Sequence, residues 1–530
     1  MVRSARLSVR MSTRAASPIA SGISRVDPNA VLAIVAVAQF MVILDASIVN
    51  VSLPTIKRDI GMSQTDLAWI LNAYTLMFGG FLLLGGRLAD RLGRRLVFMV
   101  GITVFSGASL VCGLSHSESA LYVARGLQGL GGALVSPAAL SIILTTFEEG
   151  TERNRALSVW AAVAGAGGAI GLLLGGVIVD VLGWRWVFFV NVPVGAAVLT
   201  LASRIVPESR TQAGAKSAYD VEGALAITVG TIVLVFTLMN ADRWGWTSGR
   251  AIAGFVLSAV LIIAFVVIER RHQDPLVPLR IFLNRSVSTA DATLLVMAAA
   301  LFGIYFFVTL YLQQVLGFSA SKTGVAFLPL SLTIVGASAV ASKLVDRFTP
   351  KPVLLAGLLT TIGGFVLLST LSGHGDYGSH VVPAMILLGI GPGISFVPIT
   401  IAGTSGVAPE DCGLASGLLN TTQQVGGALG LAILSTVAAH RTTSALHAGS
   451  APPAALTHGF TGAFLVCGAL IAVGAVLSIA LMPGRRHERP HEHVQAVALS
   501  FARFPGAPHW GHHARLVAFG RRLRGSLARS

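Results

Sequence analysis

The feature that most constrains this chain is a succession of long apolar segments, because about 20 consecutive apolar residues make one helical crossing of a bilayer. Only 12% of the residues are charged, whereas 54% are hydrophobic. This composition excludes an ordinary soluble domain and predicts an all-α polytopic membrane protein. Fourteen stretches approach the required length, over residues 31–53, 67–86, 96–115, 120–145, 155–179, 185–206, 221–240, 250–268, 286–314, 322–342, 352–372, 381–404, 413–439 and 459–482.

Basic residues alternate between the two sides of these segments. Arg87 and Arg91 follow the second segment, Arg270 and Arg271 the eighth, and Lys343 the tenth. The positive-inside rule therefore predicts that these loops and both termini are cytoplasmic. We expect the chain to lie in the plasma (inner) membrane. The formal charge of +15 is accordingly assigned to topology, and no nucleic-acid partner is predicted.

Two basic tails flank the apolar region. Residues 1–30 are predicted to form a cytoplasmic tail, and residues 483–530 a second one that is rich in histidine. The second tail has three readings: it is solvated, it lies on anionic lipid, or its histidines bind a metal. A solvated tail is favoured over metal binding, so no metal site is assigned.

An internal repeat divides the chain. The stretch Gly86–Arg95 (GRLADRLGRR) shares a basic-Leu-x-Asp-Arg core with Ser342–Lys351 (SKLVDRFTPK). The first copy follows the second segment and the second copy follows the tenth, so two extra segments separate two similar halves. We expect an N-terminal six-helix bundle (31–206), two inserted spans with loops (207–280) and a C-terminal six-helix bundle (281–482). In such parallel repeats the substrate path lies between the bundles.

Four motifs carry a family resemblance. They are Leu44–Pro54 (LDASIVNVSLP), Gly85–Arg95 (GGRLADRLGRR), Arg125–Ala133 (RGLQGLGGA) and Trp184–Gly195 (WRWVFFVNVPVG). With them the chain resembles the fourteen-span drug:proton antiporter group of the major facilitator superfamily, the multidrug and antibiotic exporters. The resemblance implies proton-coupled export of lipophilic drug-like compounds across the plasma membrane by alternating access. It departs in one place, because Leu172 stands where the group's fifth-span motif normally has proline.

Two functions outside antiport stay open at this stage. One is a facilitator that imports a nutrient or siderophore, and the other is a transport-inactive membrane sensor. The sequence contains no Gly-x-x-x-x-Gly-Lys-Ser/Thr loop and no catalytic constellation. We therefore expect neither an enzyme nor a bound cofactor.

Asp45 and Arg125 are the candidates for proton coupling. Asp45 precedes Leu53, the outer end of the first segment, by eight residues, which places it at a depth of about 12 Å. Arg125 follows the outer start of the fourth segment by five residues, at a depth of about 8 Å. Opposite charges at similar depth can pair, and intramembrane ionisable groups are functional by default. The alternative is a static ion pair that holds two helices together.

Two further sets of residues have expected conformational roles. A cytoplasmic gate is predicted in the two repeated loops, with topology signalling as the alternative; in it Asp90 and Arg94 are spaced to pair on one helical turn. Close packing and sliding are expected of glycines in the fifth segment. The gate set is Gly86, Arg87, Asp90, Arg91, Gly93, Arg94, Asp346 and Arg347, and the glycines are Gly167, Gly171, Gly175 and Gly176.

Polar residues within the segments are the candidates for the substrate path. Most single polar residues in membrane helices only bond a neighbouring helix, which is the alternative for each of them. The scarcity of intramembrane charges favours a lipophilic solute that is neutral or cationic. The candidate residues are Gln39, Asn50, Asn72, Tyr74, Gln128, Tyr305 and Gln423.

Overall fold

The computed structural model describes residues 27–482, except 64–65, 148–150, 209–219, 273–274, 276, 374–375 and 408–411. The first of the two tails therefore lies almost wholly, and the second wholly, outside the described residues, and their predicted roles stay predictions. The described residues belong to one compact unit. Within the described ranges every regular element is a helix.

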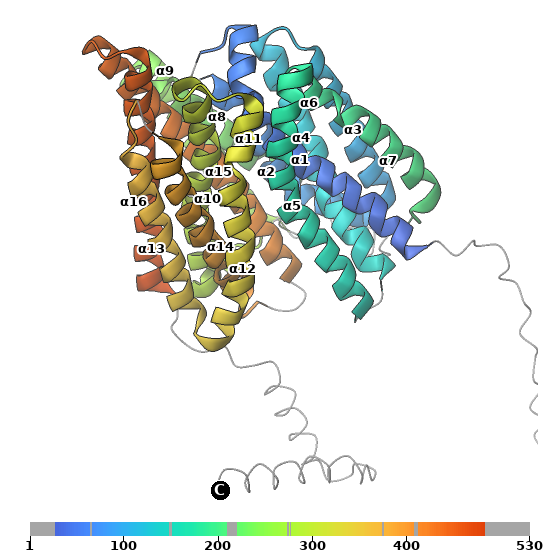
Figure 1. Cartoon of the computed structure of the whole chain (residues 1–530). Coiled ribbons are helices and arrows are strands. Elements are labelled where there is room, and N and C mark those ends of the chain that lie inside the picture. The colour runs from blue at the N-terminus through green and yellow to red at the C-terminus, as the bar shows by residue number, and fades with distance from the viewer. Residues whose placement is uncertain are drawn as a thin grey trace, which may run out of the picture. The chain divides into compact units, whose positions relative to one another are not determined.

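The helices follow one another along the chain (Figure 1). They are α1 (Pro28–Ile60), α2 (Leu67–Leu92), α3 (Arg94–Leu114), α4 (Glu118–Thr146), α5 (Thr151–Leu182), α6 (Trp186–Phe189), α7 (Asn191–Ile205), α8 (Val221–Trp244), α9 (Gly249–Arg271), η1 (Leu279–Leu283), α10 (Arg285–Gly303), η2 (Ile304–Val308), η3 (Tyr311–Val315), α11 (Ala320–Ala326), α12 (Leu328–Arg347), α13 (Pro350–Ser369), η4 (Tyr377–Val381), α14 (Val382–Thr404), α15 (Cys412–His447) and α16 (Pro452–Leu481).

Each of the fourteen predicted segments overlaps a helix or a continuous run of helices. Twelve of these, among the described residues, are long and apolar enough to cross a membrane. Of the other two, α5 contains the shorter apolar stretch Gly167–Leu182 among its described residues, and α15 is 36 residues long but is not among the twelve. The polytopic helical class is thus confirmed, whereas the number fourteen stays a prediction.

Local sequence sets where the helices begin and end. The Asp27 carboxylate accepts a hydrogen bond from the Asn29 amide at 2.9 Å and caps the start of α1, while Gly61, with φ of 82°, ends it. Glycine suits this left-handed position because it has no Cβ. We call the end of the helices at Gly61 the outer end, and the end at Gly93, where α2 turns into α3, the inner end, following the predicted sidedness.

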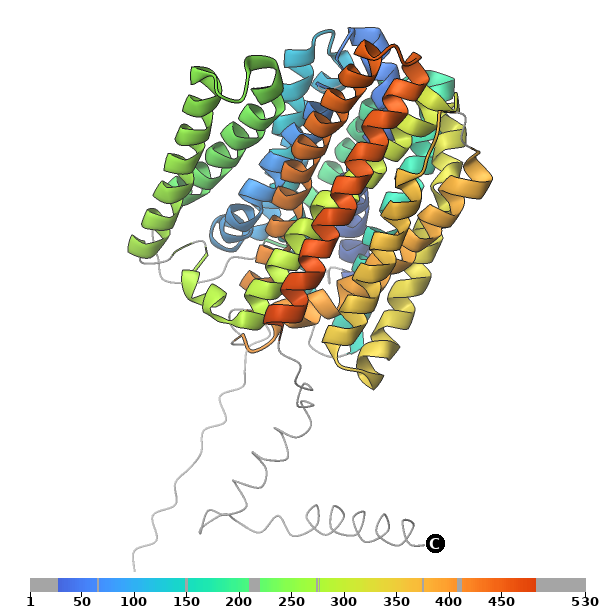
Figure 2. The ribbon, with the colours of Figure 1, turned by 90° about the vertical axis from the view of Figure 1, so that its left-hand side faces the viewer.

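The helices pack in two groups joined by a hairpin. Helix α4 packs against α2 and α3, and α1 packs against α5; in the second half α14 packs against α12 and α13, and α10 against α15 and α16. Helices α8 and α9 pack on each other and form the hairpin at the left edge of Figure 2. Because α8 also contacts both α2 and α15, the hairpin lies against both halves. This grouping is compatible with the domain boundaries expected from the repeat, which stay a proposal.

Candidate functional site

A large cavity lies between the two halves. Its volume is about 1420 Å³, and its wall comes from α1, α2, α4 and α5 on one side and α10 and α15 on the other. Towards the inner end the wall includes Arg87, Pro275 and Arg280, and it ends at mid-depth near Arg125 and Tyr305. The cavity exceeds the roughly 300–1,000 Å³ of typical small-molecule sites, so a drug-sized compound fits.

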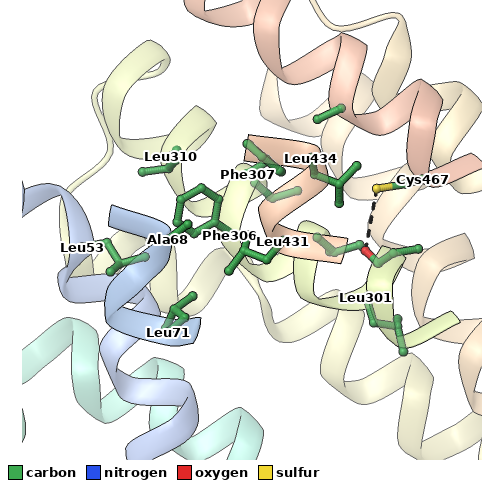
Figure 3. Close-up of a cluster of buried hydrophobic side chains, with 14 of the residues drawn as sticks. Leu53, Ala68, Leu71, Leu301, Phe306, Phe307, Leu310, Leu431, Leu434 and Cys467 are labelled. Carbon is green, nitrogen blue, oxygen red and sulfur yellow. Dashed lines mark hydrogen bonds between the residues drawn. The ribbon is translucent and has the colours of Figure 1, made fainter. Parts of the chain in front are cut away.

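Apolar packing closes the space above the cavity. Leu53, Ala68 and Leu71 of the first half meet Phe306 and Leu310 of the second half in one buried cluster (Figure 3). These side chains are buried, so water has no continuous route through them. The described structure is therefore closed at the outer end and hollow towards the inner end.

Polar contacts reinforce the closed outer end. The Asp180 carboxylate of α5 accepts hydrogen bonds from the amides of Ala320 and Ser321 at the start of α11, at 3.2 and 2.8 Å. Across the same boundary the Gln313 side-chain amide donates to the Val51 carbonyl at 3.0 Å. Both contacts join the two halves, so both must break before the outer end can open. Neither contact can be predicted from the sequence, because the partners are far apart in the chain.

Asp45 and Arg125 meet at the floor of this cavity. The Nη1 atom of Arg125 lies 2.6 Å from the Asp45 Oδ2 atom, and both side chains are fully buried. Arg125 Nε also donates to the Ile70 carbonyl of α2 at 3.1 Å. The guanidinium carbon lies 4.4 Å from the Tyr74 ring centre, a cation–π contact. The pairing expected from similar depth is thus present.

Two amide side chains complete the surroundings of Asp45. Gln128 Nε2 and Asn191 Nδ2 donate to Asp45 Oδ1 at 2.8 and 3.0 Å. Gln128 Oε1 in turn accepts from Arg125 Nη1 at 2.7 Å. Buried charges persist only when they are paired and hydrogen-bonded, and this network meets that requirement for the carboxylate. Arg125 Nη2 has no hydrogen-bond partner, and Arg125 contributes to the cavity wall.

The structure brings most of the expected substrate-path residues together. Gln39, Asn50, Tyr74, Tyr305 and Gln423 all line the cavity, and so do Asn420 and Gln424. Two of the expected residues lie elsewhere in the described structure. Asn72 is buried with its amide nitrogen 3.6 Å from the Met239 sulfur of α8, and Gln128 serves the Asp45 network.

The gate residues are only partly described. Gly86 and Arg87 line the inner part of the cavity, and the Arg87 guanidinium donates to the Pro275 carbonyl. Gly93 makes the turn between α2 and α3 with φ of 114°. The side chains of Asp90 and Asp346 lie outside the described residues, so the Asp90–Arg94 pair stays a prediction. The remaining members are Arg91, Arg94 and Arg347; the Arg347 guanidinium carbon lies 5.6 Å from the Phe348 ring centre.

The α5 glycines allow close helix approach on two sides. A Cβ at Gly167, Gly171 or Gly175 would collide with side chains of α1. A Cβ at Gly176 would instead lie 2.5 Å from the Ala320 carbonyl oxygen of α11, in the other half. Gly324 of α11 packs equally closely against α5, because a Cβ at this position would lie 2.5 Å from the Leu172 carbonyl oxygen. The first three glycines therefore pack within one half, and Gly176 packs between halves.

Comparisons with known proteins agree with this architecture. The family model described as the Major Facilitator Superfamily matches residues 35–431. Among solved structures, the transporter PepTSo of the POT family superposes with a TM-score of 0.63 at 15% identity and covers 86% of this chain and 99% of its own. A bacterial homologue of the human lysosomal transporter Spinster, inward-facing and unoccupied, gives 0.61 at 16% identity and covers 86% and 97%. At such identities the likeness shows the fold alone.

The sequence relatives are much more similar. The puromycin resistance protein pur8 of Streptomyces alboniger is 40% identical and covers 86% of this chain and 91% of its own. The cephamycin export protein CmcT of Amycolatopsis lactamdurans is 37% identical, with 88% and 95% covered. The tetracenomycin C resistance and export protein of Streptomyces glaucescens is 38% identical, with 80% and 78% covered. This chain is therefore a multi-pass membrane transporter of the Major Facilitator Superfamily.

Proposed function

We propose that this protein exports lipophilic drug-like compounds or antibiotics across the plasma membrane in exchange for protons, by alternating access. The relatives named for resistance to or export of puromycin, cephamycin and tetracenomycin C support the direction and the substrate class. The cavity that reaches the inner end supports loading from the cytoplasm under the predicted topology, in which both termini are cytoplasmic.

The single observation that carries the proton coupling is the buried pair of Asp45 and Arg125 at the cavity floor. A buried charge persists only while it is paired and hydrogen-bonded, and the Arg125 guanidinium is the charged partner of this carboxylate. Protonation removes the negative charge, which breaks the ion pair and leaves Arg125 to find other partners. A buried ion pair is thus the part of the network that a proton changes most.

The exchange then proceeds in two half-cycles. With the outer end open, a proton from outside binds Asp45, and the protonated protein reorients so that the cavity faces inwards. Proton release to the cytoplasm restores the Asp45–Arg125 pair, and the substrate enters the cavity in the state that the structure describes. Outward reorientation requires the contacts at Asp180 and Gln313 to break, and the cavity to close at its inner end near Arg87.

The proposal is tested with purified protein in proteoliposomes that contain a pH-sensitive dye and are held under a pH gradient. Addition of tetracenomycin C should drive proton movement through the wild-type protein. Asp45→Asn keeps the shape of the side chain but cannot cycle between charged and neutral forms, so it should abolish that movement. If the variant still couples drug and proton fluxes, the assignment of Asp45 is wrong.

A matched control lies on the same helix. Asp59 pairs with Arg185 at 2.5 Å, but this pair is partly exposed, whereas that of Asp45 is fully buried. Asp59→Asn removes an aspartate–arginine pair without touching the cavity floor and should leave coupling intact. The same assay shows the direction of transport. If the drugs accumulate in the compartment that corresponds to the cell exterior, the protein is an exporter, and if they leave that compartment, it is an importer.

A further inference from the structure

The cavity wall carries no carboxylate among its described residues. Its charged members are Arg87, Arg125 and Arg280. Asp45 is fully buried beneath Arg125. Asp291 of α10 accepts a hydrogen bond from Thr422 at 3.1 Å, Glu269 of α9 accepts one from the Val277 amide at 3.2 Å, and neither is part of the wall. An organic cation that enters the cavity would thus meet guanidinium groups before it meets any carboxylate.

The polar part of the wall consists mainly of amides and hydroxyl groups. Carboxamides come from both halves, with Gln39 and Asn50 on α1 and a group of three on α15, namely Asn420, Gln423 and Gln424. Aromatic rings lie among them, at Tyr74, Phe78, Trp160, Phe302 and Tyr305. Amides recognise hydroxyl and carbonyl groups, and aromatic rings stack on flat ring systems.

Several of these wall side chains have hydrogen-bonding capacity that the protein does not use. Asn50 donates its amide nitrogen to the carbonyls of Ala46 and Ser47 at 3.2 and 3.3 Å, which leaves its oxygen without a partner. The oxygens of Gln39 and Ser136 and the Nη2 atom of Arg125 also lack partners. Asn50 and Gln39 are 7% and 8% exposed. Unsatisfied groups so deeply buried are costly. Each of these atoms has less than 1 Å² of accessible surface, so its side chain must turn into the cavity before a bound molecule can supply the missing partner.

We infer that this cavity selects uncharged aromatic compounds that bear hydroxyl and carbonyl groups, and that it discriminates against organic cations. The inference rests on the proposed function, because it takes the cavity as the substrate site. It narrows the class expected from composition, which admitted neutral and cationic solutes alike. Substrate hydroxyl groups would donate to the oxygens of Asn50 and Gln39 once these side chains turn into the cavity, and a substrate carbonyl would accept from Arg125 once the side chains that cover its Nη2 atom move aside.

The test is equilibrium binding in lipid nanodiscs without any proton gradient, so that it does not depend on coupling. Three fluorescent probes are compared by anisotropy, with empty nanodiscs to subtract partitioning into lipid. They are daunorubicinone, which is uncharged and rich in hydroxyl and carbonyl groups, daunorubicin, which adds a cationic amino sugar to the same rings, and ethidium. We expect daunorubicinone to bind saturably and at least tenfold more tightly than either cation.

Substitutions in the cavity wall test whether the probes bind there. Asn50→Leu should weaken daunorubicinone binding by about two- to tenfold, the equivalent of one hydrogen bond. Asn240→Leu is the matched control, because Asn240 on α8 makes the same kind of bond to its own helix, to the Phe236 carbonyl at 2.9 Å, away from the cavity. Asn420→Asp adds a carboxylate of the same shape to the wall and should convert ethidium into a saturable ligand.

The outcomes separate the two proposals. If the cations bind as tightly as daunorubicinone and displace it, or if no probe binds saturably, the inference about the substrate class is overturned. If daunorubicinone binds as expected but drives no proton movement in proteoliposomes, the selectivity stands and the proton coupling fails. If ethidium drives proton movement and daunorubicinone does not, the coupling stands and the selectivity is wrong.

Discussion

Substitution of one glycine should shift the protein towards its outward-open state. Gly176 of α5 faces the start of α11, and an added Cβ would lie 2.5 Å from the Ala320 carbonyl oxygen and 2.7 Å from the Ser321 Cα atom. Both are backbone atoms, so no side chain can turn away. Ordinary contacts begin at about 3.4 Å, and the two helices must therefore separate for Gly176→Ala to be accommodated.

The magnitude follows from the cost of overpacking. Extra methyl groups in close-packed regions cost about 1–3 kcal/mol. The clash exists only while the two halves touch at the outer end, so this cost falls on the inward-open state alone. A free-energy cost of about 1–3 kcal/mol on one of two states changes their ratio by about 5- to 150-fold, so the ratio of outward-open to inward-open molecules should rise by that factor.

Distances between spin labels measure this ratio directly. Labels at Val181→Cys and Val325→Cys would report on α5 and α11 near the contact, and these side chains are 73% and 56% exposed, so labelling disturbs no packing. The background carries alanine at the three native cysteines. Gly176→Ala should enlarge the population with the longer distance.

Gly336→Ala is the control for this experiment. Gly336 lies on α12, where an added Cβ would meet nothing within 4 Å, and the distance distribution should match that of the glycine parent. If Gly176→Ala folds and gives the parental distribution as well, the α5–α11 contact does not hold the outer end closed, and the reasoning fails.

Three further perturbations test the network, the outer end and the hairpin. Asp180→Asn leaves one oxygen to accept from two α11 amides and loses the charge, so the same spin-label pair should show a smaller outward shift, about two- to tenfold, than Gly176→Ala. Gln128→Leu removes one donor from Asp45 Oδ1 and should cut proton-coupled transport by roughly tenfold or more without loss of folded protein, as judged by flux and size-exclusion profile. Glu269→Ala removes the acceptor of the Val277 amide at 3.2 Å and should lower the midpoint of thermal unfolding by several degrees, measured in detergent.

The sequence predicted those parts of the site that helix geometry determines. Depth along a helix is a linear function of residue number, so the sequence alone places Asp45 and Arg125 at similar depths, and in the structure they pair. The same argument placed Asn50, Tyr305 and Gln423 within spans, and all of them line the cavity. Fold class and family followed from apolar length and from motifs in order.

The sequence does not show in which direction a side chain points around its helix axis. Asn72 and Gln128 have suitable depths, but Asn72 turns to Met239 of α8, and Gln128 turns to Asp45. Gln128 follows Arg125 by three residues, a spacing that places both on one helix face, and this was the signal that could have assigned it. No such signal existed for Asn191, which reaches Asp45 from another helix, or for Asp180, whose partners belong to α11.

Arg125 takes part in both proposals, because it pairs with the proton-binding Asp45 and also lines the substrate cavity. Its three nitrogens have separate surroundings: Nε bonds to α2, Nη1 bonds to Asp45 and Gln128, and Nη2 is free at the cavity floor. While Asp45 is ionised, the pair fixes Nη2 at the cavity floor, where we propose that a substrate carbonyl reaches it once the side chains that bury it move aside. Protonation of Asp45 removes the strongest of these bonds, so the guanidinium is no longer fixed and the substrate loses a charged donor. Proton and substrate then exclude one another by acting on one side chain, which is the condition for exchange rather than co-transport. A substrate analogue without a carbonyl group should consequently bind with an affinity that does not depend on the protonation of Asp45, and Asp45→Asn should weaken the binding of daunorubicinone but not that of the analogue.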